Sequence, residues 1–344
     1  MMKMEVAAVI PTRNRSAYVK SILEDLSRQT YPINEVIIVD ASDDKRYKDE
    51  LFERFHQLPL VWVDSEASVC VQRNKGISLA KSAWIFLCDD DIKIPDDYVE
   101  QLINFIKGNT DCGSVSGLFM QNEGDEWVFS YPYKNFRALV WAYLFKLSVW
   151  GRVDRMEVNY FMKPFYKSIC NYYQSLGNTM TTAGWPVITQ LDNPHFKTQT
   201  YSLGSSITKR TWLVDSPYDE VLDPSGIGDN YGVTLGFPDG QTIHVTHSTF
   251  SHNYRAKDNR LKASTAYFRR ILALHYYLMT RDGFTLNNRR WFVWSLFGNV
   301  LLSLGKFKWH LVKANVKAIG LILMNRNPYV VGKRDGRKII KPTC

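Results

Sequence analysis

Short runs of apolar, β-branched and aromatic residues alternate with helical patterns along the first third of the chain. Five runs predict buried strands, because they are too short for helices: Val6–Ile10, Glu35–Val39, Leu60–Val63, Trp84–Leu87 and Gly113–Phe119. Between them, apolar residues recur three and four positions apart, as at Val19, Ile22, Leu23 and Leu26. This alternation predicts an α/β fold with a doubly wound, mostly parallel sheet.

The pattern changes twice after this region. From about residue 121 to 200 the alternation is lost and aromatic residues become dense. Within it, Leu139–Val149 predicts an apolar helix, either buried or dipping into lipid, and burial is favoured because most apolar helices belong to cores. A strand-like run spans Thr242–Phe250, and the pattern after Lys262 is helical. We therefore expect a first part at 1–120, a second at 121–260 and a C-terminal helical extension at 261–344.

Composition and charge narrow the class of protein. The chain has 344 residues, of which 45% are hydrophobic, so collagen-like and disordered classes are excluded. Its 43 basic and 34 acidic residues give a net charge of +9, which favours an anionic partner. Nucleic acid is not the partner we expect, because no known binding module is recognisable. Five cysteines without a C-x-x-C pair favour a reduced compartment, and no apolar run is long enough for a signal peptide or a membrane span.

Polar residues follow the predicted strands at the positions where chemistry is expected. Ligands of parallel α/β sheets bind beyond the carboxyl ends of the strands, and these ends carry Pro11–Arg15, Asp40–Asp44 and Asp89–Asp91. Three consecutive carboxylates repel one another unless a cation neutralises them. The triplet therefore predicts a divalent cation, Mg²⁺ or Mn²⁺, held by carboxylate oxygens and substrate phosphates. No G-x-x-x-x-G-K-[ST] loop or G-x-G-x-x-G turn follows a strand, which disfavours Walker ATPases and dinucleotide enzymes.

Four ordered segments resemble the family 2 glycosyltransferases. They are Ala8–Arg15, Gln29-Thr-Tyr-Pro with Glu35–Ser42, Gln72–Gly76 and Phe86–Asp91. The resemblance implies a GT-A fold, a nucleotide-sugar donor, a divalent cation and an inverting transfer of the kind used in bacterial surface polysaccharide synthesis. It also implies roles for nine residues. The donor-binding residues would be Pro11, Thr12 and Arg15 in the nucleotide pocket, Asp40 at the base, Arg73 near the base or diphosphate, and Asp89 and Asp90, while the metal ligands would be Asp91 and His252.

The second half of the chain resembles the same family more loosely. Leu203–Arg210 is similar to the segment that precedes the acceptor site, and Gly226–Asn230 is similar to the loop that carries the catalytic base. Asp229 is the candidate base, although Gly228 stands where the family commonly has Glu. Asp219 and Asp223 are the alternatives.

The expected reaction is sugar transfer to a hydroxyl of a glycan or lipid-linked glycan. Two other classes stay open: a sugar-nucleotide nucleotidyltransferase, which would typically carry glycines directly after the first strand, and a non-catalytic nucleotide-sugar-binding protein.

The C-terminal region suggests a second kind of partner. Trp309, Val312, Val316, Ile319 and Leu323 recur at helical spacing, and Lys306, Lys313 and Lys317 lie on a separate face. This pattern predicts docking on an anionic membrane surface, and hence a cytoplasmic protein bound at the inner face of the cell membrane. The alternative is that the stripe packs against the rest of the protein.

Overall fold

The computed structural model describes residues 4–344 except 134, 193, 239–240 and 256–260. Its first third alternates strands and helices: β1 (Val6–Thr12), α1 (Ser16–Ser27), β2 (Glu35–Asp40), α2 (Lys48–Arg54), β3 (Leu60–Asp64), α3 (Val69–Leu79) and β4 (Trp84–Cys88). These strands are parallel and lie in the order β4-β1-β2-β3. All seven residues of β1 are buried, as in sheets covered on both faces. The predicted strands and their order along the chain are confirmed.

The sheet continues with strands from the middle of the chain. Next to β4 lies the antiparallel β11 (Ser205–Lys209), followed by β6 (Ser114–Glu123), the parallel β12 (Ile243–Asn253) and β10 (His195–Thr198). Two short strands, β5 (Ile92–Lys93) and β7 (Glu126–Val128), pair with β12 and β6. The helices among these strands are α4 (Tyr98–Gly108), α7 (Arg210–Asp215) and α8 (Asp229–Leu235). Residue 120 lies inside β6, so the first two expected parts share one sheet.

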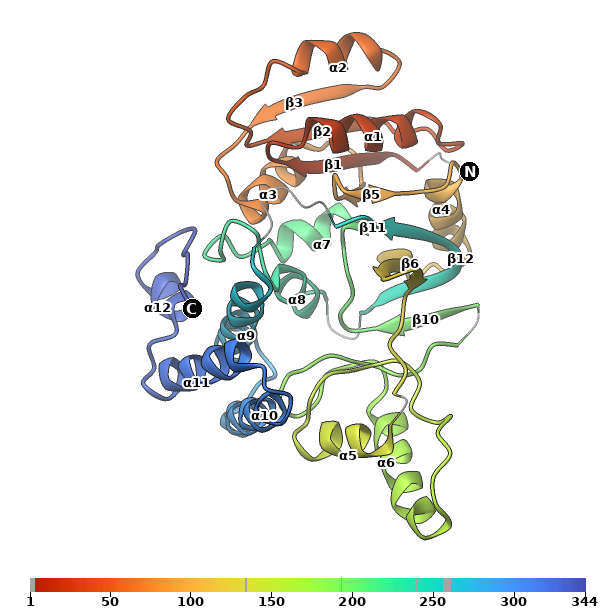
Figure 1. Ribbon diagram of the computed structural model, residues 1–344. Coiled ribbons are helices and arrows are strands. Elements are labelled where there is room, and N and C mark those ends of the chain that lie inside the picture. The colour runs from red at the N-terminus through yellow and green to blue at the C-terminus, as the bar shows by residue number, and fades with distance from the viewer. Residues whose placement is uncertain (1–3, 134, 193, 239–240, 256–260) are drawn as a thin grey trace.

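The aromatic-rich region forms a small lobe with its own core. It contains α5 (Phe136–Leu144), β8 (Val149–Trp150), the 3₁₀ turn η1 (Tyr160–Met162), α6 (Lys163–Leu176) and β9 (Val187–Ile188), and Figure 1 shows it in yellow-green below the sheet. Leu139 and Ala142 of α5 are buried against Ile169 and Tyr173 of α6, whereas Leu144 is half-exposed. The apolar helix expected here thus buries one face only.

Four helices complete the chain: α9 (Ala263–Thr280), α10 (Leu286–Gly305), α11 (Trp309–Leu323) and α12 (Pro328–Arg334). Figure 1 shows them together, in blue, beside α8 and the lobe. The central helix is α9, which buries most of its length and packs on α8, α10, α11 and α12. No helix among the described residues is long and apolar enough to cross a membrane.

The apolar stripe expected on α11 is not the face that packs. The helix buries Ala314, Asn315, Ala318 and Ile322, while Trp309, Val316 and Leu323 of the stripe are exposed. Small residues allow α11 to approach its neighbours closely. Val312 and Ile319 of the stripe are half-buried, and Ile319 packs against the core, so the stripe packs against the protein only in part.

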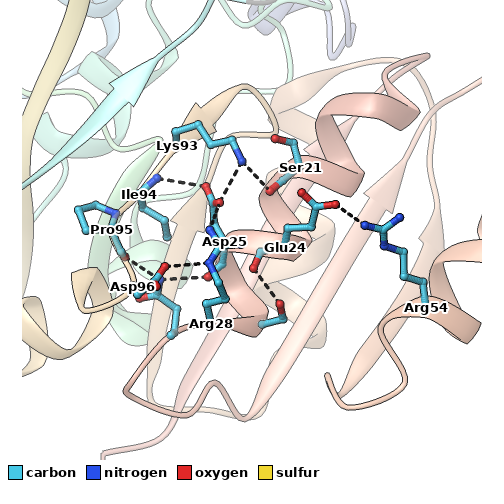
Figure 2. Close-up of polar contacts among 11 residues, drawn as sticks. Ser21, Glu24, Asp25, Arg28, Arg54, Lys93, Ile94, Pro95 and Asp96 are labelled. Atoms are coloured by element: carbon cyan, nitrogen blue, oxygen red, sulfur yellow. Dashed lines mark hydrogen bonds and ion pairs between the residues drawn. The ribbon is translucent and has the colours of Figure 1, made fainter.

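A buried carboxylate fixes the segment that follows the acidic triplet. Asp25 of α1 is almost fully buried and accepts bonds from Lys93 Nζ (2.9 Å), Arg28 Nη2 (2.8 Å) and the backbone N–H of Ile94 (3.3 Å), as Figure 2 shows. Lys93 also donates to the carbonyl of Ser21. Since Lys93 and Ile94 are the second and third residues after Asp89–Asp91, this network ties the triplet to α1.

We expect Asp25→Asn to lower the free energy of unfolding by about 1.5–3 kcal/mol, because hydrogen bonds from charged groups to a buried carboxylate are lost or weakened. The matched control is Glu24→Gln, which removes the neighbouring pair with Arg54 (2.6 Å) on the surface and should cost less than about 1 kcal/mol. Urea denaturation measures both. Equal losses in the two variants would contradict the anchoring role of Asp25.

Candidate active site

The ends of β1 and β4 are joined through Asp90. Thr12 Oγ1 donates to Asp90 Oδ2 (2.7 Å) and Arg15 Nη1 donates to Asp90 Oδ1 (2.9 Å). Burial of the Asp90 carboxyl raises its pKa to about 6, against the opposing charge of Arg15. Asp90 is therefore an internal support that holds the two strand ends in register. Pro11, Thr12, Arg15 and Asp90 also line a cavity of about 320 Å³.

Asp89 and Asp91 face a second cavity, of about 300 Å³, on the same edge of the sheet. Arg15 Nη1 lies 3.7 Å from an Asp91 oxygen, and Arg73 Nη2 lies 2.5 Å from an Asp89 oxygen. The backbone of Asp89 donates to the carbonyl of Gly204 (2.8 Å), where a Cβ atom would overlap the Asp89 carboxylate. A glycine at 204 is thus required by the close approach of β11 to the triplet.

Arg73 connects this edge of the sheet to the second half of the chain. Its guanidinium, almost fully buried, bonds Asp89 on one side and Asp229 Oδ2 on the other. Its carbon lies 5.0 Å from the centre of the Tyr218 ring, within the range of a cation–π contact. Burial alone would lower the pKa of Arg73, but Asp89, Tyr218 and Asp229 hold it well above the usual value. The guanidinium is therefore a fixed positive charge between two carboxylates.

Asp229 stands where two cavities meet. It is the first residue of α8, directly after Gly228. Gly228 has a φ of 92°, a left-handed conformation that glycine adopts without steric cost. Its Oδ1 accepts the backbone N–H of Asn230 (2.7 Å). Burial raises the pKa of Asp229 to about 6, and Arg73 opposes the rise. Asp229 lines both the 300 Å³ cavity beside the acidic triplet and a larger one of about 780 Å³.

The two alternative bases are engaged elsewhere. Asp219 accepts bonds from Tyr276 and Arg281 at the end of α9, and Lys333 of α12 lies within 3.4 Å. Asp223 is fully buried and pairs with Arg269 (3.1 Å) and Tyr329 (3.1 Å). Neither lines a cavity shared with the triplet. Both carboxylates hold the C-terminal helices to the loop before α8.

The larger cavity has aromatic walls and two arginines. Its aromatic lining includes Phe119, Tyr131, Trp150, Tyr201, Tyr231 and Tyr267, and Arg255 and Arg270 add positive charge. Arg270 also lines both smaller cavities and has no ion pair among the residues that the structure describes. Arg270 carries no local sequence signal of this role, because it lies on an ordinary helix 41 residues after Asp229. Only the packing of α9 brings it to the site.

Two expected site residues lie apart from the cavities. The ring of His252 packs on Trp127, with ring centres 4.3 Å apart, whereas its neighbour Asn253 lines the 780 Å³ cavity. Adjacent strand residues point to opposite faces, so the side chains of His252 and Asn253 lie on different faces of β12. Asp40 is fully buried at the end of β2; Ser42 occupies its Oδ1, while Oδ2 has no hydrogen-bond partner among the described residues.

A metal site formed by protein groups alone is not present in the part of the chain that the structure describes, since no cluster of three or more His, Cys, Asp and Glu could hold a cation there. Asp89 and Asp91 nevertheless fit Mg²⁺ or Mn²⁺. Both offer hard carboxylate oxygens to one cavity, and such ions are commonly bound by one or two carboxylates together with substrate phosphates.

Comparison with known proteins finds similarity to glycosyltransferases. Residues 7–161 match the model of glycosyl transferase family 2. The chain is 28% identical over 128 residues to an uncharacterised glycosyltransferase of Haemophilus influenzae, covering 36% of this chain and 42% of that protein. It is 25% identical over 118 residues to a Bacillus subtilis protein named as a teichuronic acid biosynthesis glycosyltransferase, TuaG. That match covers 33% of this chain and 46% of that protein. The matches thus span less than half the length of these two relatives.

The fold also has solved counterparts. The crystal structure of S. aureus TarS residues 1–349 superposes with a TM-score of 0.50 at 13% identity, covering 97% of this chain and 92% of that one. At this identity the likeness concerns the fold alone. The expected α/β fold of GT-A type with C-terminal helices is confirmed.

Proposed function

We propose that this chain, whose residues 7–161 match the model of glycosyl transferase family 2, transfers a sugar from a nucleotide-sugar donor to a hydroxyl group with inversion. The observation that carries the proposal is the place of Asp229 between a charged cavity and an aromatic one. Direct inverting transfer needs a base within hydrogen-bond reach of the acceptor hydroxyl, at the place where that hydroxyl meets the anomeric carbon of the donor. A nucleotidyltransferase or a simple binding protein would not need a carboxylate at that boundary.

The donor diphosphate is proposed to lie in the smaller cavities. Arg15 and Arg270 line both, and Asp89 and Asp91 would hold Mg²⁺ or Mn²⁺ together with phosphate oxygens. When bound, the cation would neutralise charge that develops on the leaving diphosphate. Arg15 and Arg270 would stabilise the same negative charge on the leaving diphosphate from fixed positions. The role of Asp40 as an acceptor for a base N–H is proposed from the family resemblance alone, because its carboxylate is fully buried and lines none of these cavities.

The acceptor is proposed to enter the 780 Å³ cavity. Flat aromatic side chains such as Trp150 and Tyr201, whose ring centres are 5.8 Å apart, offer surfaces against which sugar rings can pack. Arg255 and Arg270 suit an acceptor that carries phosphate or carboxylate groups. The name of the B. subtilis relative supports a glycan of surface polysaccharide synthesis, and a lipid-linked form of it would place the protein at the inner face of the cell membrane.

Asp229 is the proposed general base. Its ionised carboxylate would take the proton from the acceptor hydroxyl as the hydroxyl oxygen attacks the anomeric carbon, and the bond to the diphosphate breaks on the opposite side. Arg73 positions Asp229 and keeps it charged against the effect of burial. Because Arg73 also bonds Asp89, the base and the proposed donor site hold a fixed distance from each other.

We expect Asp91→Ala to abolish the increase in nucleoside diphosphate affinity that Mn²⁺ produces, because the variant removes the proposed metal-ligating carboxylate. Calorimetric titration of UDP, GDP and ADP with and without Mn²⁺ measures the effect. Asp125→Ala, in the exposed turn between β6 and β7, is the control and should behave as the unaltered protein. Metal-enhanced affinity that survives in Asp91→Ala would remove Asp91 from the site.

We expect Asp229→Asn to retain nucleoside diphosphate binding but to slow sugar transfer about 10²–10⁴-fold, the usual contribution of a general base. Mass-spectrometric screening of nucleotide-sugars with glycan and lipid-linked acceptors would identify the donor and acceptor with which the transfer rate is then measured. Asp219→Asn and Asp223→Asn should lower the free energy of unfolding, while the transfer rate of the folded variants should stay close to that of the unaltered protein. A near-normal rate for Asp229→Asn would show that another group is the base.

The pH dependence of transfer has a predicted direction. Asp229 accepts a proton only when ionised, and burial raises its pKa to about 6, so the rate at saturating substrates should fall as pH drops through about 6. Asp90 has a similarly raised pKa, so diphosphate affinity must be measured over the same range. A rate unchanged down to pH ~5, with affinity constant, would contradict the assignment.

We expect Arg270→Ala to weaken nucleoside diphosphate binding on the order of 10-fold or more, because it removes a charged hydrogen-bond donor from both smaller cavities. Arg270→Lys should recover part of the loss. Arg326→Ala, an exposed arginine between α11 and α12, is the control. Equal affinities for Arg270→Ala and the control would place the diphosphate elsewhere.

A further inference from the structure

The net positive charge of the chain lies in one segment. Residues 283–334 contain nine Lys and Arg and no Asp or Glu, whereas the remainder of the chain has 34 basic and 34 acidic residues. This segment forms α10, α11 and α12. Lys306, Lys308 and Lys313, which are exposed, have no ion pair among the described residues. The charge is therefore available to an anionic partner.

An exposed apolar stripe runs the length of α10. Its inner face buries Phe292, Ser295 and Leu296, while the outer face carries large apolar residues that are 36% to 59% exposed. They are separated by three, four or eight positions and so lie on one side of the helix: Leu286, Trp294, Phe297, Leu301 and Leu304. Exposed apolar surface of this extent marks an interaction site.

The stripe continues into the turn between α10 and α11, which we call the aromatic tip, residues 306–309. Its sequence is Lys-Phe-Lys-Trp, and the side chains of Phe307 and Trp309 are 79% and 59% exposed. Two exposed aromatic rings thus alternate with two lysines along this turn. Apolar rings flanked by basic residues suit the boundary between lipid headgroups and acyl chains.

We infer that the outer face of α10 and the aromatic tip form a docking surface for an anionic lipid bilayer. This inference rests on the proposed function and specifies where the catalytic domain meets the membrane. The occupant is argued from charge complementarity, since a basic segment without a single carboxylate attracts a surface of anionic headgroups. A second copy of the chain would instead bring two equally basic faces together, which is unfavourable.

On its inner face, α10 contacts a residue next to the lining of the 780 Å³ cavity. Trp185 Nε1 donates to Ser295 Oγ (2.7 Å), next to Pro186 of the cavity lining. Tyr267, also in the lining, donates to Asn315 Oδ1 of α11 (3.1 Å). The cavity is therefore fixed relative to the docking surface, so that the headgroup sugar of a lipid-linked acceptor can enter while its chains stay in the bilayer.

The test is flotation of the full chain with phosphatidylcholine vesicles, with and without phosphatidylglycerol. The protein should float with the anionic vesicles at low salt and dissociate at high salt. Lys306→Gln with Lys308→Gln should weaken binding on the order of 25-fold, from about fivefold per lysine near an anionic surface. Phe307→Ser with Trp309→Ser should weaken it by a similar factor, because less apolar area is buried.

The matched control is Tyr160→Ser with Phe161→Ser, an equally exposed aromatic pair on η1 outside the docking surface. Its vesicle binding should be unchanged, and every variant should bind nucleoside diphosphate normally in solution. Normal diphosphate binding without flotation of the unaltered protein would overturn the docking surface and leave the proposed function intact. Flotation that the tip variants do not reduce would also overturn the docking surface. A dimer seen in ultracentrifugation that the tip variants abolish would overturn it as well. Flotation without any donor turnover would instead overturn the proposed function alone.

Discussion

One buried guanidinium holds the two halves of the site together. Arg73 bonds Asp89 at the end of β4 and Asp229 at the start of α8, two carboxylates that are 140 positions apart in the sequence. A charge removed from water is tolerated only when it is paired, so the three groups must come together if any is buried. The fold is therefore constrained to close its second half over the carboxyl ends of the first strands. The distance between the proposed donor site and the proposed base follows from that closure.

The three carboxylates of the acidic triplet differ in burial and in the residues that they contact. Asp90 is buried, and Thr12 and Arg15 satisfy its carboxylate, whereas Asp89 and Asp91 are more exposed beside the 300 Å³ cavity that all three line. Alternation along an extended segment makes this division natural. Asp25 then holds the residues that follow, so the triplet is supported from both sides. A site that handles developing charge works best when its groups are held in place before the substrate arrives.

The C-terminal helices contribute to the site as well as covering it. Asp219 and Asp223 tie them to the loop before α8, and α9 brings Arg270 to all three cavities. These contacts are buried ion pairs and hydrogen bonds, so they anchor α9 and α12 beside the site. A surface on the outside of α10 is then linked mechanically to the cavity inside.

The amino-acid sequence by itself determined the parallel strands, their order along the chain and the polar groups at their ends, because hydrophobic periodicity and strand-end chemistry are local properties. It placed Thr12, Asp89 and Asp91 at one edge for that reason. Only the tertiary structure decided which acid of the later loop faces the cavities, since Asp219 and Asp223 bond residues of the C-terminal helices whereas Asp229 bonds Arg73. The face of α11 that packs, the outward stripe of α10 and the approach of Arg270 were likewise decided by contacts between helices far apart in the chain, which no local pattern records.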